Sequence, residues 1–196
     1  MIYQNGQIAL IALGSNENSV WGEALSTVQK AMLEVGSLSE IPPQSSALYA
    51  TPAFPKGAGP DFVNAAIAIT TMLPPDALLA RLHQIEAAAG RVRAKRWGQR
   101  SLDLDLIAVG DAVLPDAQTH AHWRDLAPEE QQIETPDQLL LPHPRLQDRA
   151  FVLIPLRDVA PDWRHPLLGR SVAQMCADLS GTVRAEVEPL PLPRRP

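Results

Sequence analysis

The sequence predicts an α+β protein with the element order β-α-β-β-α-β, the ferredoxin-like sandwich in which two helices cover one face of an antiparallel sheet. Apolar or alternating runs of strand length occur between longer segments that carry apolar residues at helical spacing. Clusters of glycine and proline separate these segments. Additional elements are expected on the C-terminal side of this unit. Because a fold class says little about activity, function has to be inferred from particular side chains.

The chain begins with a predicted strand and helix. Gln7 to Leu13 is an apolar run that stops at the turn cluster Gly14-Ser15-Asn16, so we expect a buried strand. Val20 to Val35 carries apolar residues at helical spacing and ends before Gly36, which predicts a helix.

Two strands and a second helix follow. A short strand is predicted from Ser45 to Ala50, and another strand is predicted from Phe62 to Thr71. The stretch from Thr51 to Pro60 between them is too rich in proline and glycine to be helical. Pro75 suits the start of a helix and Gly90 its end, and an apolar stripe runs between them.

The strongest chemical signal lies in the next strand, which carries two carboxylates. Strand alternation puts Asp103 and Asp105 on one face, with α-carbons about 7 Å apart. The solvated face of an edge strand is the commoner explanation of an isolated Asp-x-Asp. However, carboxylates about 4 Å apart repel by about 4 kcal/mol at an effective dielectric of 20, and a divalent cation removes this penalty. Hard oxygen ligands favour Mg²⁺ over Zn²⁺, and the spacing permits two ions.

A dense cationic segment precedes these carboxylates. Five of the chain's 17 basic residues lie within it, namely Arg91, Arg93, Lys95, Arg96 and Arg100. A loop that only improves solubility could carry the same run of basic residues. Trp97 and Gly98 instead favour a segment that folds down and excludes water. Guanidinium groups beside paired carboxylates suit a polyphosphate and indicate phosphoryl-type transfer. Neither familiar glycine-rich phosphate loop is present, so side chains have to bind the phosphates.

The C-terminal part is expected to add less regular elements. Asp111 to Gln138 is polar and lacks a clear period, so we interpret it as a surface excursion. A short helix is predicted from Ser171 to Leu179 and a last strand from Thr182 to Val187. We expect a single domain over residues 1–188 and a disordered tail over residues 189–196.

Composition excludes several classes of function. The formal net charge of −5 argues against a general nucleic-acid or membrane binder, because such proteins need a basic surface. The single cysteine, Cys176, excludes an internal disulfide and a zinc–cysteine site. The apolar run from Ile8 to Leu13 is too short for a signal or membrane helix. We expect a cytoplasmic monomer that acts on small, highly charged ligands.

Other titratable residues give weaker signals. His83 and Glu86 project together from the second predicted helix, but a polar helix face is the commoner explanation. His143 lies between two prolines, where a structural role is again commoner. His120 and His122 lack a third nearby ligand, so they do not indicate a metal site.

Six short motifs occur in order along the chain. They are Gly14-Ser15-Asn16, Tyr49-Ala-Thr-Pro52, Pro60-Asp-Phe-Val-Asn64, Glu86 with Gly90-Arg-Val-Arg93, Arg96-Trp-Gly-Gln-Arg-Ser-Leu-Asp-Leu-Asp105, and Leu141-Pro-His-Pro144 through Arg149-Ala-Phe151. Together they strongly resemble the 6-hydroxymethyl-7,8-dihydropterin pyrophosphokinases of folate biosynthesis. The resemblance runs from about residue 8 to about residue 160, and the motif that ends at Asp105 is highly specific.

The resemblance implies transfer of pyrophosphate from ATP to the pterin hydroxymethyl oxygen, leaving AMP, with two Mg²⁺ ions held by Asp103 and Asp105. The residues implied to act in catalysis are Arg91, Arg100, Asp103 and Asp105. Those implied to hold ATP are His83, Glu86, Arg93, Arg96, His143 and Arg149, with Trp97 sealing the closed loop. The implied pterin pocket consists of Thr51, Pro52, Phe54, Phe62, Asn64 and Phe151. Aromatic faces and an amide suit a flat heterocycle with hydrogen-bonding edges.

Two other classes of function stay open on the residues alone. A nonenzymatic RNA-binding module would use the arginines as backbone contacts, although the two aspartates would repel phosphate and the strands lack an aromatic and basic pattern. A metal-dependent nuclease would use the same carboxylates to release nucleotides from a polymer. Joint formation of AMP and a pterin diphosphate would separate the pyrophosphokinase from both.

Overall fold

A computed structural model describes residues 6–53, 59–91, 101–127, 130, 134 and 136–191 of the chain. Within these residues, six strands form one sheet in the order β5-β1-β4-β3-β6, and β2 also pairs with β4. All of these pairings are antiparallel. The strands are β1 (Gln7–Ser15), β2 (Gln44–Ser45), β3 (Tyr49–Thr51), β4 (Phe62–Thr71), β5 (Asp103–Val109) and β6 (Glu188–Pro189).

Helices connect and cover these strands. They are α1 (Ala24–Gly36), α2 (Pro75–Ala88), α3 (Ala117–Asp125), the 3-10 helix η1 (Leu146–Asp148), α5 (Ala150–Val159), α6 (Val172–Asp178) and α7 (Gly181–Ala185). Strands β2 and β3 both pair with β4 and together take the place of one strand. The order from β1 to β5 is then ferredoxin-like, so the predicted fold class is confirmed. No helix among the described residues has the length and apolar character needed to cross a membrane.

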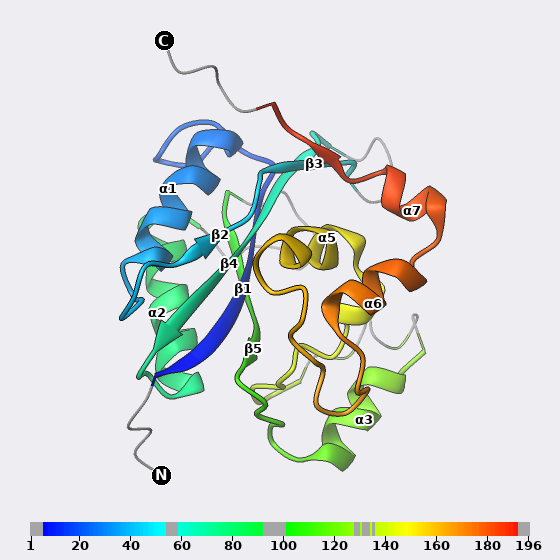
Figure 1. Cartoon of the computed structure of the whole chain (residues 1–196). Coiled ribbons are helices and arrows are strands. Elements are labelled where there is room, and N and C mark those ends of the chain that lie inside the picture. Colours follow the sequence, from blue (N-terminus) through cyan, green and yellow to red (C-terminus); the bar gives the residue numbers. More distant parts are fainter. Residues whose placement is uncertain are drawn as a thin grey trace.

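The elements form three layers. Helices α1 and α2 lie on one face of the sheet, and α5 and α6 lie on the other (Figure 1). Along β1, Ile11 and Leu13 pack in the core on the α1–α2 side, whereas Leu10 and Ala12 pack in the core on the α5–α6 side. A strand covered on both faces needs apolar residues at successive positions, which explains the continuous apolar run.

Strand β5 alternates between the two faces. Leu104 and Leu106 belong to the core on the α1–α2 side. Successive side chains of a strand point to opposite faces, so Asp103 and Asp105 point to the side of α5. The predicted shared face of the two aspartates is therefore present.

A β-bulge in β5 sets the position of a later loop. The register with β1 shifts between Leu10 and Ile11, which makes Ile107 the extra residue. The backbone carbonyl of Ile107 accepts a hydrogen bond from the N–H of His143 at 2.7 Å. The bulge thus fastens the loop around His143 beside the strand that carries the two aspartates.

The central elements agree well with the sequence-based predictions. Strand β4 has the predicted bounds, and α2 begins at Pro75 and ends before Gly90. The strand predicted from Ser45 to Ala50 is divided into the short strands β2 and β3. Helix α1 begins later than predicted, because Ser19 and Gly22 pair with each other in a turn before it.

The prediction of a last strand from Thr182 to Val187 is wrong. Helix α7 occupies most of this range, and Ser180 Oγ accepts a hydrogen bond from the backbone N–H of Val183 at 3.3 Å. A serine at this position caps the start of a helix. The alternating pattern after it is therefore overridden by a local capping interaction.

The described parts of the excursion and of the expected tail contain regular structure. The excursion contains α3, and the Asp116 side chain accepts hydrogen bonds from the backbone N–H groups of Gln118 and Thr119, both at 2.9 Å. Pro189 pairs with Tyr49 of β3, so an ordered segment extends into the expected tail. Residues 192–196 of that tail lie outside the described part of the chain.

Candidate active site

Three neighbouring strands place an amide and a carboxylate in one row across the sheet. Gly14 of β1 lies opposite Asn64 of β4 on one side and opposite Asp103 of β5 on the other. Residues directly opposite each other point to the same face, which here is the α5 side. Because neighbouring strands lie about 4.8 Å apart, the α-carbons of Asn64 and Asp103 are about 10 Å apart. The row therefore brings the amide predicted to bind the pterin close to a carboxylate predicted to bind metal.

Gly14 keeps the middle of this row open. A β-carbon added at Gly14 would lie 3.0 Å from Asn64 Oδ1 and 3.9 Å from Phe62 Cδ1. The first distance is shorter than ordinary van der Waals contact, so a side chain here would displace Asn64. The Oδ1 atom of Asn64 consequently faces the space above the glycine.

The two residues after Gly14 fasten neighbouring loops, a role that their turn-forming character alone did not reveal. Ser15 Oγ donates to the backbone carbonyl of Ser101 at 2.7 Å, just before β5. Asn16 Nδ2 donates to the backbone carbonyl of Pro60 at 3.2 Å, just before β4. Both residues are buried. Ser15 therefore holds the chain next to the row where the cationic segment leads into β5. Asn16 does the same where the proline-rich loop leads into β4.

Arg91 links the end of α2 to Asp103. Arg91 Nη1 lies 2.8 Å from Asp103 Oδ1 and also contacts Glu86 Oε1. Glu86 is 2% exposed, and its Oε1 accepts a hydrogen bond from the backbone N–H of Leu104 at 2.8 Å. Gly90, with φ of +82°, turns the chain out of α2 toward these partners. Glu86 is thus a partner of Arg91 and of β5, and direct contact of Glu86 with ATP stays a prediction.

Arg149 brings a second guanidinium to the carboxylates. It precedes α5, and its Nη1 lies 3.8 Å from Asp105 Oδ2. Its Cζ lies 5.7 Å from the centre of the Phe151 ring. The side chains of Asp103 and Asp105 are 18% and 36% exposed, so a ligand can reach both. Each carboxylate therefore has an arginine partner and an open side.

Four of the residues predicted to bind the pterin, Thr51, Phe62, Asn64 and Phe151, lie on the same side of the sheet. Asn64 Nδ2 donates to Thr51 Oγ1 at 2.7 Å, and both side chains are buried. Thr51 lies opposite Phe62 in the pairing of β3 with β4. Phe151 is 40% exposed in the first turn of α5, the helix that covers this face. Pro52 follows β3 and is half-buried, whereas Phe54 lies outside the described residues.

His143 is held as a neutral imidazole. Its Nδ1 accepts a hydrogen bond from the backbone N–H of Arg145 at 3.2 Å, which leaves the proton on Nε2. Burial lowers the pKa of His143 to about 3, and the positive charges of Arg149 and Arg145 act in the same direction. A neutral ring with Nε2–H can donate a hydrogen bond to a ligand at neutral pH.

The carboxylate pair fits magnesium by its donor chemistry. Magnesium usually binds proteins through one or two carboxylates and takes its other oxygens from water and substrate phosphates. Asp103 and Asp105 provide such a pair on one face. Within the described ranges, no group of three or more His, Cys, Asp or Glu residues is placed to hold a metal ion. The donor set therefore suits an ion shared with a phosphate ligand.

Several predicted ATP-site residues cannot be placed. Arg93, Arg96, Trp97 and Arg100 lie outside the described residues, so their roles stay predictions. His83 is exposed on α2, one turn before Glu86. Contact of His83 with ATP likewise stays a prediction.

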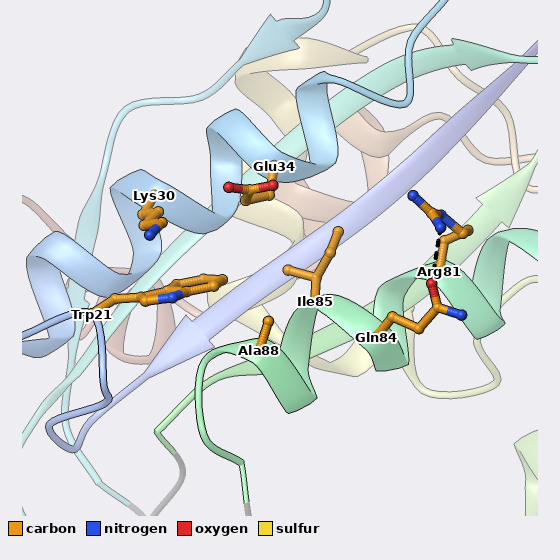
Figure 2. Close-up of a pocket in the computed structure, with 7 residues that line it drawn as sticks. All are labelled: Trp21, Lys30, Glu34, Arg81, Gln84, Ile85 and Ala88. Atoms are coloured by element: carbon orange, nitrogen blue, oxygen red, sulfur yellow. Dashed lines mark hydrogen bonds between the residues drawn. The ribbon is translucent and has the colours of Figure 1, made fainter.

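A hollow of about 290 Å³ lies between α1 and α2 (Figure 2). Its lining includes Trp21, Lys30, Glu34, Arg81, Gln84 and Ile85. Lys30 Nζ lies 4.7 Å from the centre of the Trp21 ring, and Arg81 Nη1 donates to Gln84 Oε1 at 2.9 Å. Because α1 and α2 cover the opposite face of the sheet from Asp103, the sheet separates this hollow from the candidate active site.

Known proteins resemble this chain over most of its length. A family model described as 7,8-dihydro-6-hydroxymethylpterin-pyrophosphokinase (HPPK) matches residues 10–161. A 2-amino-4-hydroxy-6-hydroxymethyldihydropteridine pyrophosphokinase of Synechocystis sp. is 34% identical over 92% of this chain and 80% of its own length. The Pseudomonas aeruginosa protein of the same name is 37% identical over 87% of this chain and 91% of its own length.

Solved structures agree with the fold. A crystal structure of Plasmodium falciparum HPPK-DHPS matches 89% of this chain with a TM-score of 0.58 at 14% identity. The match covers 45% of the Plasmodium chain, so the present chain spans less than half of it. The family match and the two bacterial relatives provide the evidence from sequence, and the Plasmodium structure adds the fold. This chain belongs to the 7,8-dihydro-6-hydroxymethylpterin-pyrophosphokinase (HPPK) family.

Proposed function

We propose that this chain transfers the pyrophosphoryl group of ATP to the hydroxymethyl oxygen of 6-hydroxymethyl-7,8-dihydropterin, a step of folate biosynthesis. The products are the pterin diphosphate and AMP. The observation that carries this proposal is the row of Asn64, Gly14 and Asp103 across three strands. It supports the proposal because the amide that we assign to the pterin and a carboxylate that we assign to metal share one face, with α-carbons about 10 Å apart.

The reaction needs positioned charge more than covalent chemistry. The alcohol oxygen forms a bond to the β-phosphorus, and the bond between this phosphorus and the α,β-bridging oxygen breaks. The bridging oxygen leaves with AMP, and the alcohol proton passes to water. Negative charge on the phosphate oxygens is stabilised by cations that are already in place. We assign no general base.

Two aspartates and two arginines beside β5 would organise this charge. We propose that Asp103 and Asp105 hold two Mg²⁺ ions, which would neutralise the triphosphate oxygens and orient them. Arg91 is fixed beside Asp103 by Glu86, and Arg149 lies beside Asp105. Both guanidinium groups can donate to phosphate oxygens without prior rearrangement of the backbone.

The pterin would occupy the space above Gly14. Asn64 Nδ2 is used by Thr51, so the Oδ1 atom is directed to the ligand and can accept an N–H of the pterin ring. Phe62, opposite Thr51, and Phe151, at the start of α5, provide aromatic faces for the flat heterocycle. The assignments of Pro52, Phe54, His83, Arg93, Arg96, Trp97, Arg100 and His143 complete the proposed site.

Phosphorus NMR of one reaction mixture tests the proposal. The full chain is incubated with ATP, Mg²⁺ and 6-hydroxymethyl-7,8-dihydropterin, and resonances are followed over time. We expect AMP and a pterin diphosphate to appear together in equal amounts. Formation of ADP, or of AMP and free pyrophosphate without a pterin product, would contradict pyrophosphoryl transfer. A polynucleotide substrate in a parallel sample tests the nuclease alternative.

We further propose that the chain acts as a monomer in the cytoplasm and binds neither nucleic acid nor membranes. The net charge of −5, with basic residues concentrated near the phosphate site, supports a small anionic ligand. Light scattering coupled to size exclusion measures the mass in solution. A mass of twice the chain's 21.3 kDa would contradict the monomer.

A further inference from the structure

Two buried imidazoles lie outside the candidate active site. His120 belongs to α3 of the surface excursion, and His165 belongs to the loop after α5. Both residues are 0% exposed. Their ring centres lie 5.9 Å apart, with an angle of 74° between the ring planes. A histidine buried this completely needs hydrogen-bond partners on its ring nitrogens.

Known partners define the tautomer of each ring. His120 Nε2 lies 2.7 Å from the backbone oxygen of Pro142, and a carbonyl only accepts, so Nε2 carries the proton. His165 Nδ1 accepts from the backbone N–H groups of Leu167 and Leu168 at 3.2 and 3.3 Å. The proton of a neutral His165 is therefore on Nε2 as well.

The remaining nitrogens are complementary. Among the described residues, neither His120 Nδ1 nor His165 Nε2 has a hydrogen-bond partner. The first is an acceptor and the second is a donor, so one water that accepts from His165 Nε2 and donates to His120 Nδ1 satisfies both. A metal ion bound between the two rings would need a nitrogen lone pair from each of them. With these tautomers only His120 Nδ1 offers one, because His165 Nε2 carries a proton.

The bond to Pro142 acts on the peptide unit that carries His143. The carbonyl of the Pro142–His143 peptide accepts from His120, and the N–H of the same peptide donates to Ile107 at 2.7 Å. Both polar groups of this peptide are thus fixed, one by the excursion and one by the bulge of β5. The preceding Leu141 is also paired, since it exchanges backbone hydrogen bonds with Leu114 at 2.8 and 3.3 Å.

We propose that His120 is a positioning residue for ATP binding. It holds the plane of the Pro142–His143 peptide and so orients the His143 ring, and His165 holds His120 in the required tautomer. The excursion thereby contributes a residue to the nucleotide site without contacting the nucleotide. This inference rests on the proposed role of His143 in holding ATP.

Variants of His120 separate positioning from general stability. His120→Ala removes the donor to Pro142, whereas His120→Gln retains an amide N–H that can reach the same carbonyl. His122, which is exposed on the same helix, provides the matched control His122→Ala. Calorimetric titration of the full chain with MgATP gives the dissociation constant without any need for turnover. Steady-state kinetics give the KM values for ATP and pterin.

We expect His120→Ala to weaken MgATP binding about tenfold and to leave the pterin KM within about twofold, because a small misplacement of a binding group is costly. His120→Gln should recover most of the affinity, and His122→Ala should match wild type. Unchanged MgATP affinity in His120→Ala would overturn the proposal. Equal losses for both substrates that glutamine does not rescue would also overturn it, because they indicate a structural role only.

Long-range ¹H–¹⁵N NMR of the histidine rings tests the tautomers even if His120→Ala does not fold. We expect the Nε2–H pattern for both His120 and His165 in the wild-type chain. An Nδ1–H pattern for His120 would refute the bond to Pro142. If MgATP binds but no pterin diphosphate forms, the proposed reaction fails while the effect of His120 on nucleotide affinity can still be measured.

Discussion

Arg91 Nη1 lies 2.8 Å from Asp103 Oδ1. The same nitrogen contacts Glu86, which also accepts the backbone N–H of Leu104. A buried glutamate, an arginine and a partly exposed aspartate therefore form one connected group between α2 and β5. A guanidinium fixed in this way needs little reorganisation when charge develops on a nearby phosphate oxygen.

Replacement of Glu86 tests the anchoring of Arg91. Glu86→Gln keeps an oxygen for the N–H of Leu104 but removes the charge that holds Arg91. We expect a folded protein whose kcat falls at least about tenfold while the pterin KM stays near wild type. Gln84→Ala, at an exposed position of the same helix, is the control for general effects on α2. Wild-type kcat in a well-folded Glu86→Gln protein would show that Arg91 needs no anchor.

Gly14 is predicted to control the pterin site by its lack of a side chain. Gly14→Ala puts a methyl group 3.0 Å from Asn64 Oδ1, so Asn64 has to move. We expect the pterin KM to rise at least about tenfold and the MgATP dissociation constant to change less than twofold. Gly181→Ala is the matched control, since an added β-carbon there meets nothing within 4 Å. An unchanged pterin KM in Gly14→Ala would remove Asn64 from the pterin site.

The two aspartates are predicted to be essential for turnover but not for folding. Asp103→Asn and Asp105→Asn remove charge at nearly constant size, and we expect each to lower kcat at least about 100-fold. Both side chains are partly exposed, so circular dichroism spectra should match wild type. Asp111→Asn, just after β5 and exposed, should retain activity. Wild-type-like turnover in either active-site variant would refute the metal assignment.

The buried histidine pair predicts a loss of stability on acidification. Burial lowers the pKa of both His120 and His165 from 6.5, in the case of His165 to about 4. The charge of Arg124 acts in the same direction on both rings, and that of Asp125 opposes it at His120. Between pH 6.5 and about 4 the unfolded chain binds more protons than the folded chain. The free energy of unfolding therefore falls as the pH falls through this window.

Urea unfolding at pH 7.5 and pH 5 measures this dependence. His165 alone should account for about 2 kcal/mol of the difference between the two pH values. His165→Asn keeps an oxygen to accept the N–H groups of Leu167 and Leu168 but does not titrate. The variant should consequently lose less stability than wild type between the two pH values. An equal loss in both proteins would contradict a neutral, buried His165.

Local signals in the sequence predicted the central elements but not all of the C-terminal ones. The alternation of residue types along the strand was sufficient to predict β4. Pro75 and Gly90 were sufficient to predict where α2 begins and ends. Helix α3 was not predicted because it buries a single residue, His120, and so has no apolar stripe. Its start depends on capping by Asp116, which lies within a polar stretch that resembles a loop.

The site was predictable where it depends on neighbouring residues and unpredictable where it depends on register. Alternation placed Asp103 and Asp105 on one face. The alignment of Asp103 with Gly14, however, depends on the bulge in β5. An unbulged register continued from Ala9 opposite Val109 would place Leu104 opposite Gly14 and take the carboxylate out of the row. No local pattern in the sequence reveals such a bulge.

The most direct test is a crystal structure of the full chain with Mg²⁺, a nonhydrolysable ATP analogue and 6-hydroxymethyl-7,8-dihydropterin. We predict Mg²⁺ within about 2.1 Å of carboxylate oxygens of both Asp103 and Asp105, with the pterin ring above Gly14 and within hydrogen-bond distance of Asn64. Metal and triphosphate bound away from β5, with either carboxylate free of metal, would contradict the account.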